Sequence, residues 1–180
     1  MIYIFLAPGF EEIEAVAPID ILRRAGLPVT VAGIGGLEVT GSHGITVKAD
    51  VIAEGLTPDE TLTGVVLPGG PGHTKLEASP EVGAFVDFAA GRGLLLAAIC
   101  AAPSILGRRG LLSCVKATCF PGYEKELNGA IFTDKPVVCH GNIITGKGAG
   151  SSVGFALEIV RYFCGLDAAD NLRGSLQCAT

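Results

Sequence analysis

Residues 94–103 read LLLAAICAAP, and this stretch decides the fold. Its first six residues are apolar without alternation, which is typical of a strand buried on both faces of a parallel sheet. Cys100 follows at once, and the next residues predict a helix over 102–109. A buried strand that turns into a helix at a single residue indicates an α/β domain.

Similar short apolar runs recur on both sides of this stretch and predict further strands. Helical patterns lie between them, and one begins at Pro80 after the N-cap residue Ser79. Residues 37–51 predict an inserted antiparallel hairpin. We therefore expect a mostly parallel sheet between helical layers, with the site at the carboxyl ends of its strands. The predicted strands are 2–6, 29–34, 65–67, 94–99, 115–119, 137–139 and 143–145, and the other helices are 11–25 and 151–164.

Length and composition indicate one globular domain over residues 1–180. The 180 residues can share one core, and 49% of them are hydrophobic against 17% charged. The net charge of -5 without a basic cluster gives no footprint for nucleic acid. The apolar start MIYIFL has no basic leader and predicts a strand, and no run approaches the roughly 20 residues that span a bilayer. We expect a cytoplasmic protein that binds no membrane.

The six cysteines are expected to remain thiols, because the cytosol is reducing. No C-x-x-C pattern occurs, so no metal site is predicted. Most of the six are expected to be small core residues.

Two glycine-rich segments come close to cofactor motifs without matching them. Residues 141–147 (GNIITGK) lack the serine or threonine that a P-loop needs next. Gly148, Gly150 and Gly154 miss the dinucleotide spacing by one residue. No cofactor is predicted.

Cys100 is the main candidate for chemistry. Ala98 and Ala102 flank it at the positions where an elbow between strand and helix admits only small side chains. Such an elbow would strain the backbone of Cys100 and expose its sulfur, and a helix N-terminus should favour the thiolate. On this pattern alone, a nucleophile and an ordinary buried cysteine are equally good interpretations.

Two other segments could complete a site around Cys100. The turn at 67–72 (LPGGPG) follows another buried strand, and its amides could form an oxyanion hole with the Ala101 amide, although an ordinary turn is the commoner explanation. Glu14 shares the apolar face of its helix, where a carboxyl is costly to bury without a partner. The neighbouring Glu11 and Glu12 are explained as solvated residues at a helix N-terminus. The histidines His43, His73 and His140 are expected at the surface.

Taken together, these segments resemble the ThiJ/PfpI superfamily and, within it, the DJ-one-like subfamily of the parkinsonism-associated deglycase and its bacterial relatives. The resemblance implies a flavodoxin-like three-layer sandwich and a homodimer. It also implies that Cys100 is the nucleophile, Glu14 its carboxyl partner, and the Gly70 and Ala101 amides the oxyanion donors. Its markers are 9–14 (GFEEIE), 20–26 (DILRRAG), 29–33 (VTVAG), 67–70 (LPGG), 97–103 (AAICAAP) and 148–157.

The chain departs from this family at positions near the cysteine. Many members have a histidine in the segment that is 118–121 (TCFP) here, where Cys119 and Phe120 stand. His43 stands where relatives often have an arginine. The candidates to line the pocket are therefore Gly69, His43, Cys119 and Phe120. Ala101 replaces the histidine of protease-like members, and no His-Glu pair of an amidotransferase is found.

The resemblance implies a cofactor-free glyoxalase or deglycase that acts on methylglyoxal-type dicarbonyls or on their early adducts with proteins and nucleotides. A redox-sensing protein or chaperone, with Cys100 oxidised to a sulfinate, is the alternative. Thiazole monophosphate biosynthesis is an inherited family label that no residue here supports.

Overall fold

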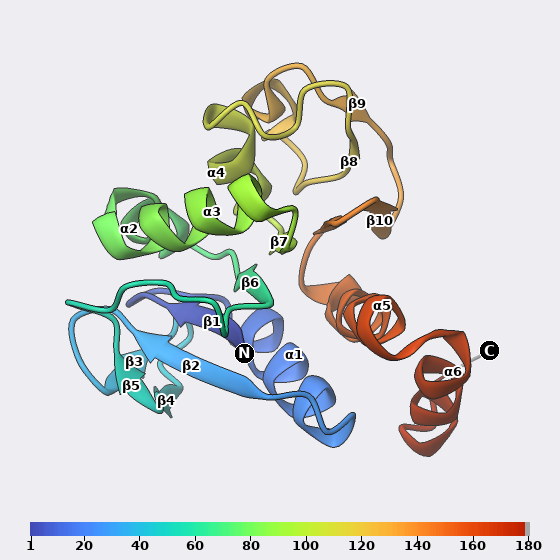
Figure 1. The fold of residues 1–180 in the computed structure, drawn as a ribbon, viewed down its shortest axis with the longest axis horizontal. Helices are drawn as coiled ribbons and strands as arrows, with labels where there is room; N and C mark the ends of the chain where they lie inside the picture. Colours follow the sequence, from blue (N-terminus) through green and yellow to red (C-terminus); the bar gives the residue numbers. More distant parts are fainter. Residues whose placement is uncertain (179–180) are drawn as a thin grey trace.

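A seven-stranded sheet forms the centre of the protein in a computed structural model, which describes residues 1–178 (Figure 1). The strand order is β10-β11-β7-β6-β1-β2-β5, and every neighbouring pair is parallel except β10 and β11. This edge pair explains why the sheet is mostly and not wholly parallel. The strands are β1 (Ile2–Leu6), β2 (Val29–Gly33), β5 (Val51–Ile52), β6 (Gly64–Leu67), β7 (Leu95–Ile99), β10 (Val137–His140) and β11 (Ile143–Gly146).

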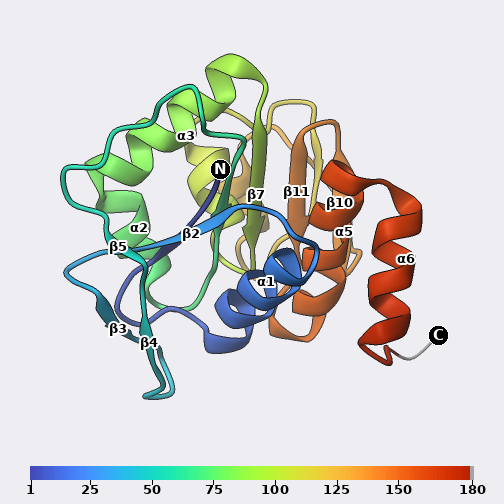
Figure 2. The same ribbon diagram turned by 60° about the horizontal axis from the view of Figure 1, so that its bottom comes forward.

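Helices cover both faces of this sheet, as Figure 2 shows. One layer contains α1 (Glu12–Arg24), α5 (Ser152–Cys164) and α6 (Leu166–Ser175), and the other contains α2 (His73–Ala78), α3 (Pro80–Arg92) and α4 (Pro103–Arg108). Two short 3-10 turns, η1 (Glu124–Leu127) and η2 (Ala149–Ser151), complete the helical elements among residues 1–178. The predicted α/β sandwich with a mostly parallel sheet is confirmed.

The two core layers explain the unbroken apolar runs. On β1, Phe5 packs toward Phe85 of α3, with ring centroids 5.1 Å apart. Its neighbours Ile4 and Leu6 face the opposite layer, in the cluster that contains Phe155 of α5. Successive side chains of a strand point to opposite faces, so every position must be apolar when both faces are covered.

The hairpin and one further strand differ in part from the expectation. β3 (Glu38–Thr40) pairs antiparallel with β4 (Thr46–Lys48), as predicted, but Val51 belongs to β5 at the edge of the main sheet. The predicted strand 115–119 is confirmed only over β8 (Lys116–Ala117), which pairs with β9 (Ile131–Phe132) in a separate small sheet and not in the main one.

Local patterns missed two helices. α2 begins at His73, within a segment whose glycines and prolines indicate only a turn. α6 follows Gly165, which ends α5, and it buries Ala169 alone, so its hydrophobic pattern is weak. Both helices depend on contacts with neighbouring elements that short-range patterns do not contain.

All six cysteines are free. The expectation that most are core residues is wrong, because Cys119 is buried while Cys100 and Cys178 are half-buried and the other three are exposed. The exposed ones lie on turns, on the edge strand β10 and at a helix end, where any small residue is tolerated.

No helix within residues 1–178 has the length and hydropathy required to cross a bilayer.

Removing the Phe85 ring is expected to destabilise the protein strongly. Phe85 is fully buried between Tyr3 and Phe5, so Phe85→Ala should lower the free energy of unfolding by roughly 3–5 kcal/mol. Phe132→Ala is the matched control, because that ring is 42% exposed, and it should cost less than about 1 kcal/mol. Urea denaturation measures both; equal losses would show that the α3 layer does not form the core described here.

Candidate functional site

The site lies where the carboxyl ends of β1, β6 and β7 meet. These three strands are neighbours in the sheet and run in the same direction, so the loops that follow them lie along one edge. The loop after β1 leads into α1 with Glu14, the loop after β6 contains Gly69 and Gly70, and Cys100 directly follows β7. Sequence-distant residues are thereby brought together.

Cys100 has a left-handed backbone conformation, with φ of 64°. A non-glycine residue in this region is strained by about 1 kcal/mol or more, and it persists because its surroundings hold it. The Cys100 amide donates to the Gly146 carbonyl at 2.9 Å, and the Cys100 carbonyl accepts from the Phe120 amide at 2.8 Å. Neighbouring segments therefore hold the predicted elbow on both sides.

The connection from Cys100 to its helix is longer than the sequence suggested. Residues 100–102 form a turn, and α4 begins at Pro103 and has six residues. The helix predicted over 102–109 is thus slightly shorter, and its N-terminus does not lie directly at the sulfur.

Three groups surround the thiol of Cys100. The backbone amides of Gly70 and Ala101 lie close enough to the sulfur to lower the pKa of Cys100, and the Glu14 carboxyl lies next to it. The structure therefore brings together the residues proposed as nucleophile, carboxyl partner and oxyanion donors.

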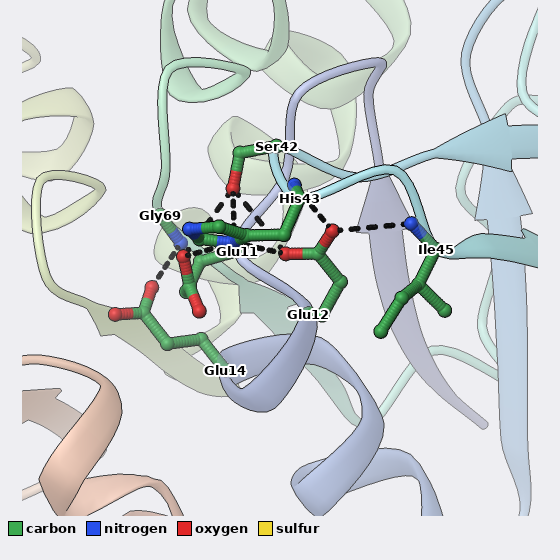
Figure 3. Close-up of polar contacts among 7 residues, drawn as sticks. All are labelled: Glu11, Glu12, Glu14, Ser42, His43, Ile45 and Gly69. Atoms are coloured by element: carbon green, nitrogen blue, oxygen red, sulfur yellow. Dashed lines mark hydrogen bonds and ion pairs between the residues drawn. The ribbon is translucent and has the colours of Figure 1, made fainter.

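Glu14 is a buried carboxyl, 1% exposed. Its Oε2 accepts a hydrogen bond from the Gly69 amide at 2.9 Å, and Figure 3 shows the side chain pointing toward Gly69. Its Oε1 is buried and has no hydrogen-bond partner among the described residues, so this oxygen is available to carry a proton. Burial raises the pKa of Glu14 to about 7, although the thiol of Cys100 and the Gly69 amide act in the opposite direction.

The resting form of Cys100 is a thiol. Burial, and then the charge of Glu14, raise the pKa of Cys100 to about 12, while the amides of Gly70 and Ala101 lower it by less. The expectation that a helix N-terminus favours the thiolate is therefore wrong. Burial of the sulfur, together with the Glu14 carboxyl beside it, outweighs a helix of only six residues that begins three positions later.

Two glycines are required by this packing. A Cβ on Gly69 would lie 2.7 Å from the Cys100 Cβ and 2.8 Å from Oε2 of Glu14, so a side chain there would separate the two groups. Gly70 has φ of +79°, and a Cβ there would lie 2.5 Å from the Glu11 amide nitrogen. The turn thus permits close approach of backbone to the sulfur.

Glu12 is not the solvated residue that its position suggested, since it is 6% exposed. Its carboxylate accepts hydrogen bonds from the His43 amide at 2.6 Å and from the His43 ring at 2.9 Å, and it binds Ser42 and Ile45 as well (Figure 3). Burial alone would raise its pKa, but these hydrogen bonds lower the pKa of Glu12 to about 2. Glu12 therefore anchors the loop of the hairpin to α1.

The same group of residues has the composition of a metal site. Glu11, Glu12 and His43 place one ligand atom each within 4.8 Å of one another. Their recorded hydrogen bonds, together with those of Ser42, join the hairpin to α1, and none reaches Cys100. His43 is thus a partner of the N-terminus of α1 and has no recorded polar contact with the sulfur or Glu14.

The remaining pocket candidates lie in different surroundings. Cys119 is buried in the core layer that contains α3 and α4, whereas Cys100 packs against the opposite core layer, and the expectation that Cys119 lines the pocket stays a prediction. Phe120 is 47% exposed. It borders an open groove of about 520 Å³ together with Pro121, Pro136 and residues 147–151.

His73 is a residue that the sequence led us to place at the surface, yet it is 6% exposed. Its Nδ1 lies 2.9 Å from the Gly70 carbonyl oxygen. A histidine three residues after the second glycine of the turn was the available signal, because side chains at this spacing can reach back to a turn carbonyl.

Comparison with known proteins agrees with this architecture. The model of the DJ-1/PfpI family matches residues 1–162. The chain belongs to the DJ-1/PfpI family. The resemblance derived from the sequence motifs is therefore confirmed.

Members of the DJ-1/PfpI family match over nearly the whole chain. Protein dj-1beta of Drosophila melanogaster is 37% identical over 180 residues, covering 98% of this chain and 96% of its own. Its crystal structure superposes with a TM-score of 0.92 over 99% of this chain and 98% of that chain. Oxidized Toxoplasma gondii DJ-1 gives a TM-score of 0.94 at 32% identity over 99% and 98%. A protein named glutathione-independent glyoxalase DJR-1.2, from Caenorhabditis elegans, is 32% identical over 164 residues, covering 90% and 87%.

Glu14 and Glu12 are expected to affect stability with opposite dependence on pH. Folding raises the pKa of Glu14 from 4.5 to about 7, so the free energy of unfolding should fall as the pH rises through this range. Glu14→Gln removes this loss. Between pH 5 and 8 the free energy of unfolding of the variant should therefore increase by on the order of 2 kcal/mol relative to that of the unmodified protein.

Folding lowers the pKa of Glu12 from 4.5 to about 2, so its contribution is present above pH 4.5 and is lost as the pH falls toward 2. Glu12→Gln should therefore destabilise the protein at neutral pH by roughly 1–3 kcal/mol and by less in acid. Urea denaturation across pH measures both variants. Parallel pH profiles for the two variants would contradict the assigned environments.

Proposed function

We propose that the protein is a cysteine-dependent, cofactor-free glyoxalase or deglycase for methylglyoxal-type dicarbonyls or their early adducts with proteins and nucleotides. The observation that carries the proposal is a buried carboxyl with a pKa of about 7 beside the thiol of Cys100. A group that titrates near neutral pH can both take and return a proton. The name of the nematode relative supports the reaction class.

The first step joins the thiol to the aldehyde carbon. Glu14 takes the proton of Cys100 as the sulfur forms a bond to this carbon, and the electron pair of the carbonyl moves onto its oxygen. The Gly70 and Ala101 amides, which face the sulfur, are placed to stabilise that oxyanion. Return of the proton from Glu14 to the oxygen gives a hemithioacetal.

The second step moves a proton between the two substrate carbons. Ionised Glu14 removes the hydrogen from the carbon that carries the sulfur, and an enediolate forms. Glu14 then returns this proton to the neighbouring carbon, while the hydroxyl proton of the first carbon moves to the oxygen of the second, which leaves a hydroxy thioester on Cys100. Water hydrolyses this thioester to the hydroxy acid and restores the thiol. The sum is dicarbonyl plus water giving hydroxy acid, so one carbon is oxidised, the other is reduced, and no external oxidant is needed.

An adduct follows the same course with one additional bond broken. Attack by Cys100 on the carbon of a carbinolamine or hemithioacetal releases the amine or thiol, which takes a proton from Glu14. The resulting hemithioacetal then proceeds as above.

Lactate production from methylglyoxal tests the enzyme. We expect measurable turnover by the unmodified protein and a loss of roughly 100-fold or more for Cys100→Ser and for Glu14→Gln. Cys119→Ser is the matched control, because its thiol lies in the core and not at the site, and its turnover should be unchanged. If unmodified protein and both site variants match the buffer blank, the enzyme proposal fails.

A redox role is the second candidate, and the same surroundings of Cys100 support it. Peroxide could oxidise the thiol stepwise to a sulfinate, whose oxygens could accept hydrogen bonds from a protonated Glu14 and from the Gly70 and Ala101 amides. The structural similarity to an oxidized relative from Toxoplasma gondii is consistent with this chemistry.

Mass spectrometry after mild peroxide treatment tests the redox candidate. A mass increase of two oxygen atoms is expected at Cys100 before the exposed Cys114, Cys139 and Cys164 react. Glu14→Leu should shift the product toward more oxidised or mixed forms, because the carboxyl no longer stabilises the sulfinate. Uniform oxidation of all exposed thiols would remove the reason to assign a redox role to Cys100.

The homodimer implied by the family stays a prediction. Ile13 and Val16 of α1 and Ile45 of the hairpin are apolar and between 44% and 57% exposed. They border one shallow groove together with Glu12 and Asp20, and such an apolar surface could bind a second copy of the chain.

A further inference from the structure

We propose that His73 is a positioning residue that holds the Gly70 turn in the conformation in which its amide faces the Cys100 sulfur. The catalytic consequence of this proposal rests on the proposed function, whereas its effect on the reactivity of Cys100 does not. His73 itself has no recorded contact with the sulfur, so its influence would pass through the backbone of Gly70.

The first observation is the double hydrogen bond to Gly70. The Gly70 carbonyl accepts from the His73 backbone amide at 3.1 Å and lies 2.9 Å from Nδ1 of the same residue. A carbonyl oxygen can only accept, so Nδ1 carries the proton in this contact. Of the two neutral tautomers, only the one with the proton on Nδ1 can make this contact.

The second observation is that Gly70 needs such a restraint. Glycine at φ of +79° has more accessible conformations than any other residue, and rotation of this turn would turn its amide away from the sulfur. Gly69 is held by Glu14 through its amide and by the Glu11 amide through its carbonyl. The His73 contacts hold the other side of the same turn.

The third observation is the position of the ring between two loops. Tyr123 packs edge-on against His73, with ring centroids 5.4 Å apart. Tyr123 belongs to the segment in which Phe120 donates its amide to the Cys100 carbonyl. His73 therefore contacts the Gly70 turn and the segment that contains Phe120, from a buried position at the start of α2.

The role of His73 differs from that of the histidine that many family members have near the cysteine. The segment 118–121 has no histidine, and Cys119 is directed into the core. The His73 ring donates to the Gly70 turn and has no contact with the sulfur, so it does not replace a proton-transfer group there. It can preserve the amide that stabilises negative charge on the sulfur or on the substrate oxygen.

Alkylation of Cys100 by iodoacetamide, followed by peptide mass spectrometry, measures the effect without any enzyme assay. Since thiolate reacts and thiol does not, a weakened Gly70 hydrogen bond lowers the rate. His73→Leu is expected to slow alkylation at about pH 8 by roughly tenfold, which corresponds to about one unit in the pKa of Cys100. His73→Asn should restore the rate to within about twofold, because its amide nitrogen can replace Nδ1 as donor.

Thr74→Val is the matched control on the same helix. The Thr74 hydroxyl donates to the Pro71 carbonyl at 3.2 Å, one residue from Gly70, and its loss should leave the alkylation rate unchanged. Thermal unfolding of all variants shows whether each is folded at the assay temperature. The proposal is overturned if His73→Leu reacts like the unmodified protein, if His73→Asn is folded and as slow as His73→Leu, or if Thr74→Val is equally slow.

Lactate assays on the same variants separate this proposal from the proposed function. Slower alkylation of His73→Leu, with rescue by His73→Asn, supports the positioning role even if neither the variants nor the unmodified protein produce lactate. Active unmodified protein with unchanged alkylation in His73→Leu would overturn the positioning role and leave the enzyme intact.

Discussion

The site depends on the close approach of a glycine turn to a strained cysteine. Gly69 lies so near to Cys100 and Glu14 that a single methyl group would overlap both. This approach is possible because β1, β6 and β7 are parallel neighbours whose following loops share one edge. The buried layers on both faces hold these strands in register, so the strain at Cys100 is maintained by the packing of the whole sheet.

Two buried carboxyls of α1 have opposite pKa shifts because they differ in hydrogen bonding, although they are two residues apart. Glu14 accepts one backbone amide and lies among apolar groups, so its protonated form is favoured and its pKa is raised. Glu12 accepts several hydrogen bonds from the hairpin loop, so its charged form is favoured and its pKa is lowered. The first property suits proton transfer at a reacting thiol, and the second suits a structural anchor.

Most of the fold could be predicted from local patterns. The runs that form β1, β6 and β7 have no charged or hydroxyl side chain except Tyr3, and β2 and β11 each contain a single threonine, which is close to the pattern required by two covered faces. Residues 115–119 look similar, but only two of them form a strand, which pairs outside the main sheet. The partner of a strand depends on segments distant in the chain, so it cannot be judged from the strand's own residues.

Short patterns of residue size were sufficient to predict the elbow at Cys100, the buried helix face that carries Glu14, and the glycine turn. Only the tertiary structure shows the pKa values of Glu14 and Cys100, the burial of Glu12 and His73, and the position of Cys119 in the core. The physical reason is that pKa values and burial depend on which distant groups lie nearby. The helix N-terminus inferred at Cys100 is a local pattern. The burial of the sulfur and the Glu14 carboxyl, which raise the pKa of Cys100, come from residues distant in the chain, and Glu14 lies 86 positions earlier.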